Sequence, residues 1–276
     1  MLGSRYGPIN DPDMKRSAIV IIILGVSFLV GCQKAEEGLM QTQTPTDEDV
    51  VTIIPITTPT IEASPTSTEI ERKGHEFPNF IDPSKRYIIY LHGKIIEDQG
   101  VTAISPEFGE YQYEDILRTI ESYGFVIISE QRPKNADGWE YAQRTAGQVD
   151  KLLTADVPPG SITVVGASKG AAIAAVTSDL VNNPEVNYVL LGTCHPTLVE
   201  EWKQGGLILS GNVLAIYDFE DDEYSGSCDE LFNLAEGKGL NRHNEIVLQV
   251  GTGHGILYQP LPEWILPTVK WAKQEW

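Results

Sequence analysis

Residues 76–276 of this 276-residue chain predict an α/β fold with a mainly parallel sheet of about six strands. Apolar segments rich in β-branched residues alternate with segments of helical periodicity. Each strand segment is apolar without interruption, which is typical of parallel strands that are buried on both faces. We therefore expect helices on both faces of the sheet and a ligand site at the carboxyl ends of its strands.

Six segments are expected to be strands. They are 86–92, 125–129, 162–165, 187–192, 212–217 and 245–250. The helices between and after them are expected at 113–123, at 140–153, from 169 onward and at 261–274. The segment 76–85 is too short to hold a further hairpin. The edge of the sheet beside the first strand is therefore expected to be open or covered by this segment.

Ser168 lies between the third strand and the following helix, in Gly166-Ala167-Ser168-Lys169-Gly170. A strand that enters a helix through this pattern resembles the nucleophile elbow of the α/β-hydrolases. In such a turn the serine is strained, and side chains at 166 or 170 would collide with neighbouring backbone. An ordinary turn with a helix-capping serine is the alternative.

The resemblance covers residues 86–275 and implies a compact α/β-hydrolase fold, with a serine, an acid and a histidine in that chain order. His254 follows the last strand in Gly251-Thr-Gly-His-Gly, which gives it the order and place of the base. The acid follows the fifth strand, where Asp221 is expected and Asp218 and Asp222 are alternatives. A structural loop histidine and a solvated acidic cluster, or a cation site, are the other interpretations.

The resemblance also implies two backbone N–H donors for a developing oxyanion. One is the N–H of Lys169, the residue after the nucleophile. The other lies in the turn after the first strand, His92-Gly93-Lys94, where Lys94 is the expected donor and Ile95 the alternative. His92 is expected to order this turn by hydrogen bonding rather than to transfer a proton.

Charged side chains beside these turns have simpler expected roles. Those of Lys94 and Lys169 would raise the positive potential near an oxyanion, but exposed lysines are the commoner case. Glu130 and Arg132 follow the second strand. For them a mutual ion pair at the rim is expected rather than substrate recognition.

Residues 1–32 have the layout of a secretory signal. Met14-Lys15-Arg16 is a short basic region, and Met14 is the expected start because the acidic residues before it are unusual in a signal. The apolar run 17–31 is shorter than the ~20 residues of a membrane-spanning helix. Leu29-Val30-Gly31-Cys32 resembles the lipobox of bacterial lipoproteins, which implies lipidation of Cys32. An uncleaved signal anchor is the alternative.

Residues 33–75 are dominated by Thr, Pro, Ser and acidic residues. Such a segment buries too little apolar surface to offset its ordering entropy, and its prolines keep it extended. We expect a disordered tether between the lipid on Cys32 and a domain at 76–276. The expected location is extracytoplasmic, anchored by lipid to the bacterial cell membrane.

Cys194 and Cys228 remain as an even pair in an oxidising compartment, which predicts a disulfide, with two buried thiols as the alternative. The sequence has no Cys–His metal spacing, and no glycine-rich phosphate loop follows the first strand. We therefore expect no metal and no cofactor. The net charge of −19 argues against nucleic acid as a partner and against charge-driven attachment to anionic lipid.

Together these features favour a serine hydrolase that cleaves carboxylic esters through an acyl-enzyme, with Ser168, Asp221 and His254 as its triad. The segment between the fourth and fifth strands is short, which suggests an open site for a small or extended ester. We expect a monomer. A binding lipoprotein on a hydrolase scaffold without turnover is one alternative, and a peptidase or acyltransferase with the same triad is another.

Overall fold

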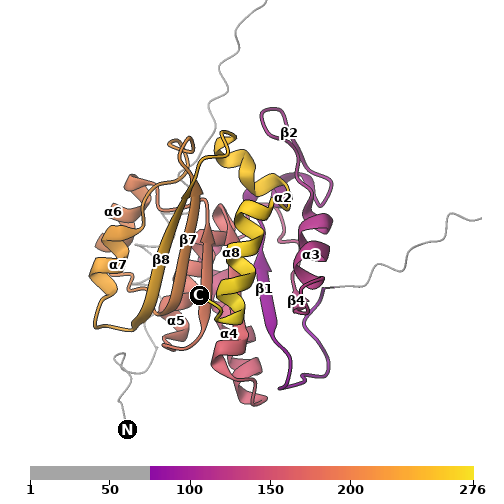
Figure 1. Ribbon diagram of the computed structural model, residues 1–276, viewed down its shortest axis with the longest axis vertical. Coiled ribbons are helices and arrows are strands. Elements are labelled where there is room, and N and C mark those ends of the chain that lie inside the picture. The colour runs from indigo at the N-terminus through magenta and orange to yellow at the C-terminus, as the bar shows by residue number, and fades with distance from the viewer. Residues whose placement is uncertain (1–74) are drawn as a thin grey trace, which may run out of the picture. The chain divides into compact units, whose positions relative to one another are not determined.

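A six-stranded sheet organises residues 75–276, the part of the chain that the computed structural model describes (Figure 1). Its strands lie in the order β4-β1-β5-β6-β7-β8, and every neighbouring pair is parallel. They are β1 (Tyr87–Leu91), β4 (Val126–Ile128), β5 (Ile162–Ala167), β6 (Asn187–Leu191), β7 (Gly211–Asp218) and β8 (Leu240–Leu248). The predicted α/β class and six-stranded parallel sheet are confirmed. The predicted signal, Cys32 and the tether up to residue 74 lie outside the described residues.

Helices cover both faces of the sheet, as Figure 1 shows, and each face has its own apolar core. One face packs against α4 (Gly138–Thr154), α5 (Lys169–Val181), α6 (Pro196–Gln204) and α7 (Asp229–Ala235). The other packs against α2 (Lys94–Gln99), α3 (Tyr113–Glu121) and α8 (Pro262–Lys273). Side chains alternate between the two cores along each strand, so that Ile88 and Ile89 of β1 face opposite layers.

The chain reverses its direction of travel across the sheet at β1. From β1 it moves outward to β4, then returns to β5 on the other side of β1 and continues toward β8. The expectation that the first strand borders the edge is therefore wrong, because β4 occupies that edge. The chain also contacts this edge at His75, whose carbonyl oxygen accepts a hydrogen bond of 2.7 Å from Ser129 N. A reversal of this kind opens a crevice between the carboxyl ends of the two strands, here β1 and β5.

Several shorter elements were not expected from the sequence. They are α2, α6, α7, the two-stranded sheet of β2 (Ile104–Ser105) and β3 (Gly109–Glu110), and the 3-10 helices η1 (Pro159–Ser161) and η2 (Gly253–Tyr258). β8 also begins at Leu240 rather than 245, because this edge strand is only half buried and carries charged residues such as Arg242. None of the helices within residues 75–276 is long and apolar enough to cross a membrane.

Candidate active site

Ser168 occupies a strained turn at the carboxyl end of β5. Its φ of 53° and ψ of −118° are rare for a residue with a side chain. Its backbone N–H donates to Leu191 O at the end of β6, at 2.8 Å, and its side chain makes no capping hydrogen bond to α5. The alternative interpretation, in which the Ser168 side chain caps α5, is therefore wrong. The half-exposed hydroxyl is left free of the helix it precedes.

The two glycines that flank Ser168 permit this turn because β5, β1 and α5 approach closely. A Cβ at Gly166 would lie 2.6 Å from Ala171 Cα. A Cβ at Gly170 would lie 2.8 Å from His92 O and even closer to Leu91 O. Real Cβ atoms essentially never come under 3.0 Å. Any side chain at either position would push α5 away from the sheet.

His254 and Asp221 meet across the loops that follow β8 and β7. His254 Nδ1 lies 2.6 Å from Asp221 Oδ2, and both side chains are buried. Ser225 Oγ donates a second hydrogen bond to the same carboxylate oxygen. Because a carboxylate only accepts, Nδ1 carries the proton, and the lone pair of the neutral imidazole is on Nε2.

The imidazole lies beside the end of β6, next to the Ser168 turn. A Cβ at Gly192 would lie 3.2 Å from His254 Cε1, and Gly192 directly follows Leu191, the acceptor of the Ser168 N–H. Gly192 also has a φ of 61°, so both its conformation and its space require glycine. The structure thus brings the histidine and its carboxylate to the end of the sheet that carries the half-exposed Ser168.

The other two candidate acids have different surroundings. Asp218 is fully buried and accepts hydrogen bonds from Glu220 N at 3.1 Å and Val250 N at 2.7 Å, which ties the loop after β7 to the chain after β8. Asp222 is exposed. Of the three carboxylates, only that of Asp221 contacts His254.

The turn after β1 lies against Ser168. A Cβ at Gly93 would lie 3.7 Å from Ser168 Cβ. Lys94 is the first residue of α2 and Lys169 the first of α5, so neither N–H has a partner within its own helix. Neither amide donates a backbone hydrogen bond to any other residue in 75–276. Two free N–H groups therefore flank the serine.

His92 holds this turn in place and stays neutral. Its Nδ1–H donates to Gly93 O at 2.8 Å, and its Nε2 accepts from Arg132 N at 2.9 Å. Burial, and then the charge of the Arg132 guanidinium, lower the pKa of His92 to about 3. A histidine with both ring nitrogens bonded to backbone has no free position for proton transfer.

A buried carboxylate that the sequence did not reveal, Glu97 of α2, connects the two turns. It accepts from Arg132 Nε at 2.8 Å and from Lys169 Nζ at 2.7 Å. The Lys169 side chain is 10% exposed and also donates to Ala136 O, and its burial lowers its pKa. The expectation of an exposed lysine at this position is wrong. No motif could have indicated Glu97, because its partners are 35 and 72 residues away in sequence.

The expected ion pair between Glu130 and Arg132 does not form. Arg132 turns inward to Glu97 and also donates to His92 O, while Glu130 pairs with Arg144 on the surface. The inward pairing is favoured because Arg132 is 1% exposed, and a buried guanidinium requires a counter-charge. Lys94 pairs with Asp98 one helical turn away.

Aromatic side chains and a disulfide frame the histidine and its carboxylate. The rings of Tyr224 and Phe108 lie 4.7 and 6.3 Å from that of His254, centroid to centroid. Cys194, after β6, is bonded to Cys228 at the start of α7. Cys194 also forms an antiparallel bridge with Ser225, the donor to Asp221. The disulfide therefore restrains the loop that carries the acid.

Residues 75–276 contain no group of three or more His, Cys, Asp or Glu side chains that could hold a metal ion. In the acidic cluster at the end of β7, Asp218 and Asp221 are buried, whereas Glu220, Asp222 and Glu223 are exposed.

No family model and no curated protein matches the sequence. Similar solved structures include Arabidopsis thaliana SOBER1, at 12% identity and a TM-score of 0.45 over 69% of this chain and 99% of that one. A truncated carbohydrate esterase from gut microbiota has 12% identity and a TM-score of 0.45 over 71% and 89%. A hyperthermophilic esterase from the archeon Pyrobaculum calidifontis has 19% identity and a TM-score of 0.41 over 74% and 77%. We therefore infer the function of this chain from the residues of its own site.

Proposed function

We propose that this protein is a serine hydrolase of the α/β-hydrolase family that cleaves carboxylic esters. The observation that carries the proposal is the buried hydrogen bond between His254 Nδ1 and Asp221 Oδ2, formed beside the strained Ser168 turn. A serine nucleophile needs a base in the correct tautomer and a carboxylate that fixes that tautomer. Here the acid and base have this relationship, and Gly192, beside the imidazole, directly follows the residue whose carbonyl accepts the Ser168 N–H.

In the proposed reaction His254 Nε2 accepts the proton of Ser168 Oγ as that oxygen attacks the acyl carbon of the ester. The carbonyl oxygen becomes an oxyanion, and the free N–H groups of Lys94 and Lys169 donate hydrogen bonds to it. Collapse of this intermediate breaks the bond to the alkoxy group, which leaves as the alcohol with the proton from His254. Water then attacks the acyl-enzyme with His254 as base, which releases the acid and restores the serine.

Tyr224 and Phe108 favour an ester whose acyl or alkoxy group is apolar, because their rings flank the imidazole and present apolar surface beside it. Only α6, nine residues long, lies between β6 and β7. A short connection at this place favours an open site and a small or extended ester.

We also propose that the chain is extracytoplasmic and attached to the bacterial membrane by lipid on Cys32. The disulfide between Cys194 and Cys228 supports this location, since disulfides persist in oxidising compartments. Incorporation of labelled palmitate into the expressed chain, and its loss in Cys32→Ser, tests the anchor.

The test of activity is hydrolysis of 4-nitrophenyl acetate by the purified full-length chain, with fluorophosphonate labelling in parallel. Ser168→Ala should abolish both, and Ser122→Ala, which removes an exposed hydroxyl at the end of α3, should change neither. For the acid, Asp221→Asn should lower kcat by about 10⁴-fold, as expected when the wrong histidine tautomer is held. Asp222→Asn is the matched control and should retain activity.

The outcomes separate the alternatives. Labelling of Ser168 without ester turnover favours a peptidase or an acyltransferase that uses the same residues. The absence of labelling in a chain with intact circular dichroism would contradict the proposal and favour a binding protein on this scaffold. Equal losses in Asp221→Asn and Asp222→Asn would contradict the assignment of the acid.

A further inference from the structure

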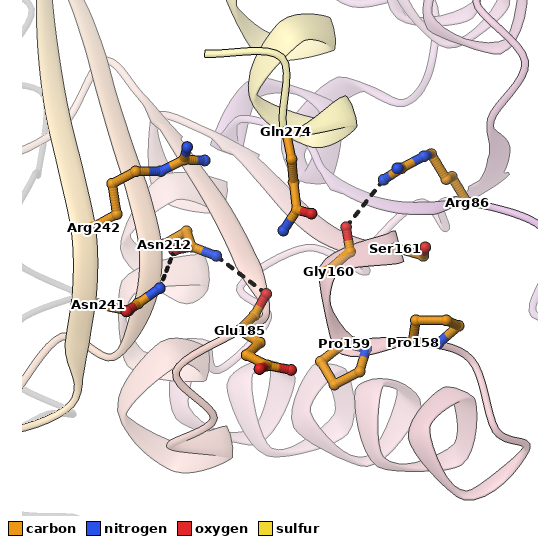
Figure 2. A pocket seen from close by; sticks show the side chains of 10 residues that line it. All are labelled: Arg86, Pro158, Pro159, Gly160, Ser161, Glu185, Asn212, Asn241, Arg242 and Gln274. Carbon is orange, nitrogen blue, oxygen red and sulfur yellow. Dashed lines mark hydrogen bonds between the residues drawn. The ribbon is translucent and has the colours of Figure 1, made fainter.

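A cavity of about 660 Å³ lies at the end of the sheet opposite Ser168. Its walls come from the segments that enter the strands: Arg86 precedes β1, Ser161 precedes β5, and Arg242 is near the start of β8. Gln274, which ends α8, covers it from one side (Figure 2). This volume falls within the range of about 300–1,000 Å³ for small-molecule sites. Because the proposed catalytic residues lie at the carboxyl ends of the strands, this cavity is independent of the proposed function.

Two arginines without a counter-charge line this cavity. Residues 75–276 contain five arginines, and three of them pair with carboxylates. The other two, Arg86 and Arg242, form no ion pair with any residue of this part of the chain, and both line the cavity. In a chain with 39 acidic residues and only 20 basic ones, two unpaired guanidinium groups in one cavity are unexpected. Figure 2 shows them entering from opposite sides.

Arg242 is held in place by an aromatic ring and not by a carboxylate. Its guanidinium carbon lies 4.2 Å from the ring centroid of Trp271, which is itself fully buried. Its Nε is buried and has no hydrogen-bond partner. Buried donors are almost always satisfied, so this unpartnered N–H shows that the described residues give the guanidinium no acceptor at its base.

Arg86 and the amides on the walls are fixed in a similar way. Arg86 donates from one terminal nitrogen to Gly160 O at 3.1 Å and Ala272 O at 3.0 Å, which fixes the side chain without neutralising it. Asn212 donates to Glu185 O at 3.2 Å and accepts from Asn241 at 2.9 Å. The Glu185 carboxylate is the one acidic group among the lining residues and is exposed at the rim. The lining therefore has a net positive charge.

We propose that this cavity binds a small molecule with at least two oxyanionic groups, carboxylate or phosphate, held between Arg86 and Arg242. The guanidinium fork matches both kinds of group, with paired N–H donors and charge-assisted hydrogen bonds. Two separate arginines suit a ligand with more than one anionic group. The cavity is also larger than a single inorganic ion needs.

The test is isothermal titration calorimetry of the full-length chain at low ionic strength, with citrate as the carboxylate probe and inorganic pyrophosphate as the phosphate probe. We expect one site for at least one probe and weaker binding as sodium chloride is added. Arg242→Gln should weaken that binding by about tenfold or more, because it removes charge-assisted hydrogen bonds. Arg118→Gln removes an exposed arginine that pairs with Asp115 and should leave binding unchanged. A preference for one probe identifies the class of anion.

Two further measurements keep the proposal open to refutation. If Arg242→Gln does not fold, Arg242→Lys retains the charge but not the fork and should still weaken binding. In ¹⁵N-labelled protein, the indole N–H resonance of Trp271 should shift on titration, because the Arg242 guanidinium stacks on that ring. Failure of both probes to bind, or equal binding by the Arg242 and Arg118 variants, would overturn the proposal. Hydrolysis of 4-nitrophenyl acetate should be unaffected by Arg242→Gln, which separates the two sites.

Discussion

Acid should destabilise this protein through one histidine, His92. Its ring is fully buried in the turn after β1, and both ring nitrogens bond to backbone atoms only when the ring is neutral. Protonation of Nε2 would break the bond from Arg132 N and place a cation beside the buried Arg132 guanidinium. The folded state therefore resists the proton that an unfolded chain readily accepts.

The size of the effect follows from the two pKa values of this side chain. His92 has a pKa of about 3 when folded, against 6.5 for an ordinary histidine. Between these values the unfolded chain binds a proton that the folded chain does not, so stability is full above pH 6.5 and falls as the pH drops toward 3. At about 1.4 kcal/mol per pH unit, the complete loss is about 5 kcal/mol, and about 3 kcal/mol is lost by pH ~4.5.

Urea unfolding of the wild type and His92→Gln, at about pH 7.5 and about pH 4.5, isolates this contribution. The difference in unfolding free energy between the two proteins should shrink by about 3 kcal/mol at the lower pH, because only the wild type can take up the proton. His243→Gln, at an exposed position of the half-buried strand β8, is the matched control for the loss of a histidine side chain. A His92→Gln difference that is the same at both pH values would refute the reasoning.

Two further predictions concern buried positions and are also measured by urea unfolding. Glu97→Gln should lower the free energy of unfolding by about 3–5 kcal/mol, because it leaves two largely buried cations without their carboxylate. Glu130→Gln, in a surface pair, should lower it by less than about 1 kcal/mol. Similar losses in the two variants would contradict the role given to burial. Gly170→Ala should lower the free energy of unfolding by about 3 kcal/mol or more, because the added methyl group collides with the backbone that ends β1. Gly147→Ala, in open space on α4, should raise it by up to about 1 kcal/mol. A Gly170→Ala variant as stable as the wild type would contradict the close approach.

Local sequence predicted those features that depend on neighbouring residues alone. The run from Ile162 to Val165 is apolar and β-branched, so it indicates a buried strand with no knowledge of its partners. The glycines around Ser168 predict a turn that no larger residue permits, and the clash distances agree. The order of the strands in the sheet could not be predicted in this way, because the local sequence does not indicate on which side of β1 each later strand pairs.

Features that depend on distant pairs could not be predicted. Asp218, Asp221 and Asp222 lie within five residues at the end of β7, and only the fold shows which of them faces His254. The sequence favours an ion pair between Arg132 and Glu130, two residues away, yet the partner of Arg132 is Glu97, which is 35 residues away. Arg242 belongs to a half-exposed edge strand, whose sequence has no continuous apolar run, so the sequence did not indicate that this residue lies in a strand. In each case the local pattern was compatible with several partners.

The ion pairs of Glu97 with Arg132 and Lys169 matter more for the proposed reaction than for the stability of the fold. A buried ion pair is rarely worth more to folding than apolar residues of the same size, so its position matters more than its energy. Through Lys169 and Arg132, this one carboxylate joins the turn after β5 to the turn after β1. These turns carry the two N–H groups proposed to hold the oxyanion.

If those N–H groups act together, Glu97→Gln should lower kcat for 4-nitrophenyl acetate by about tenfold or more while KM changes little. The loss should stay below the 10²–10³-fold caused by removal of a donor, because both amides remain and only their spacing relaxes. Glu130→Gln, which alters only a side chain paired with Arg144 on the surface, should retain its kcat. A folded Glu97→Gln protein with wild-type kcat would mean that backbone packing alone sets the spacing, and that Glu97 serves only to neutralise Arg132 and Lys169.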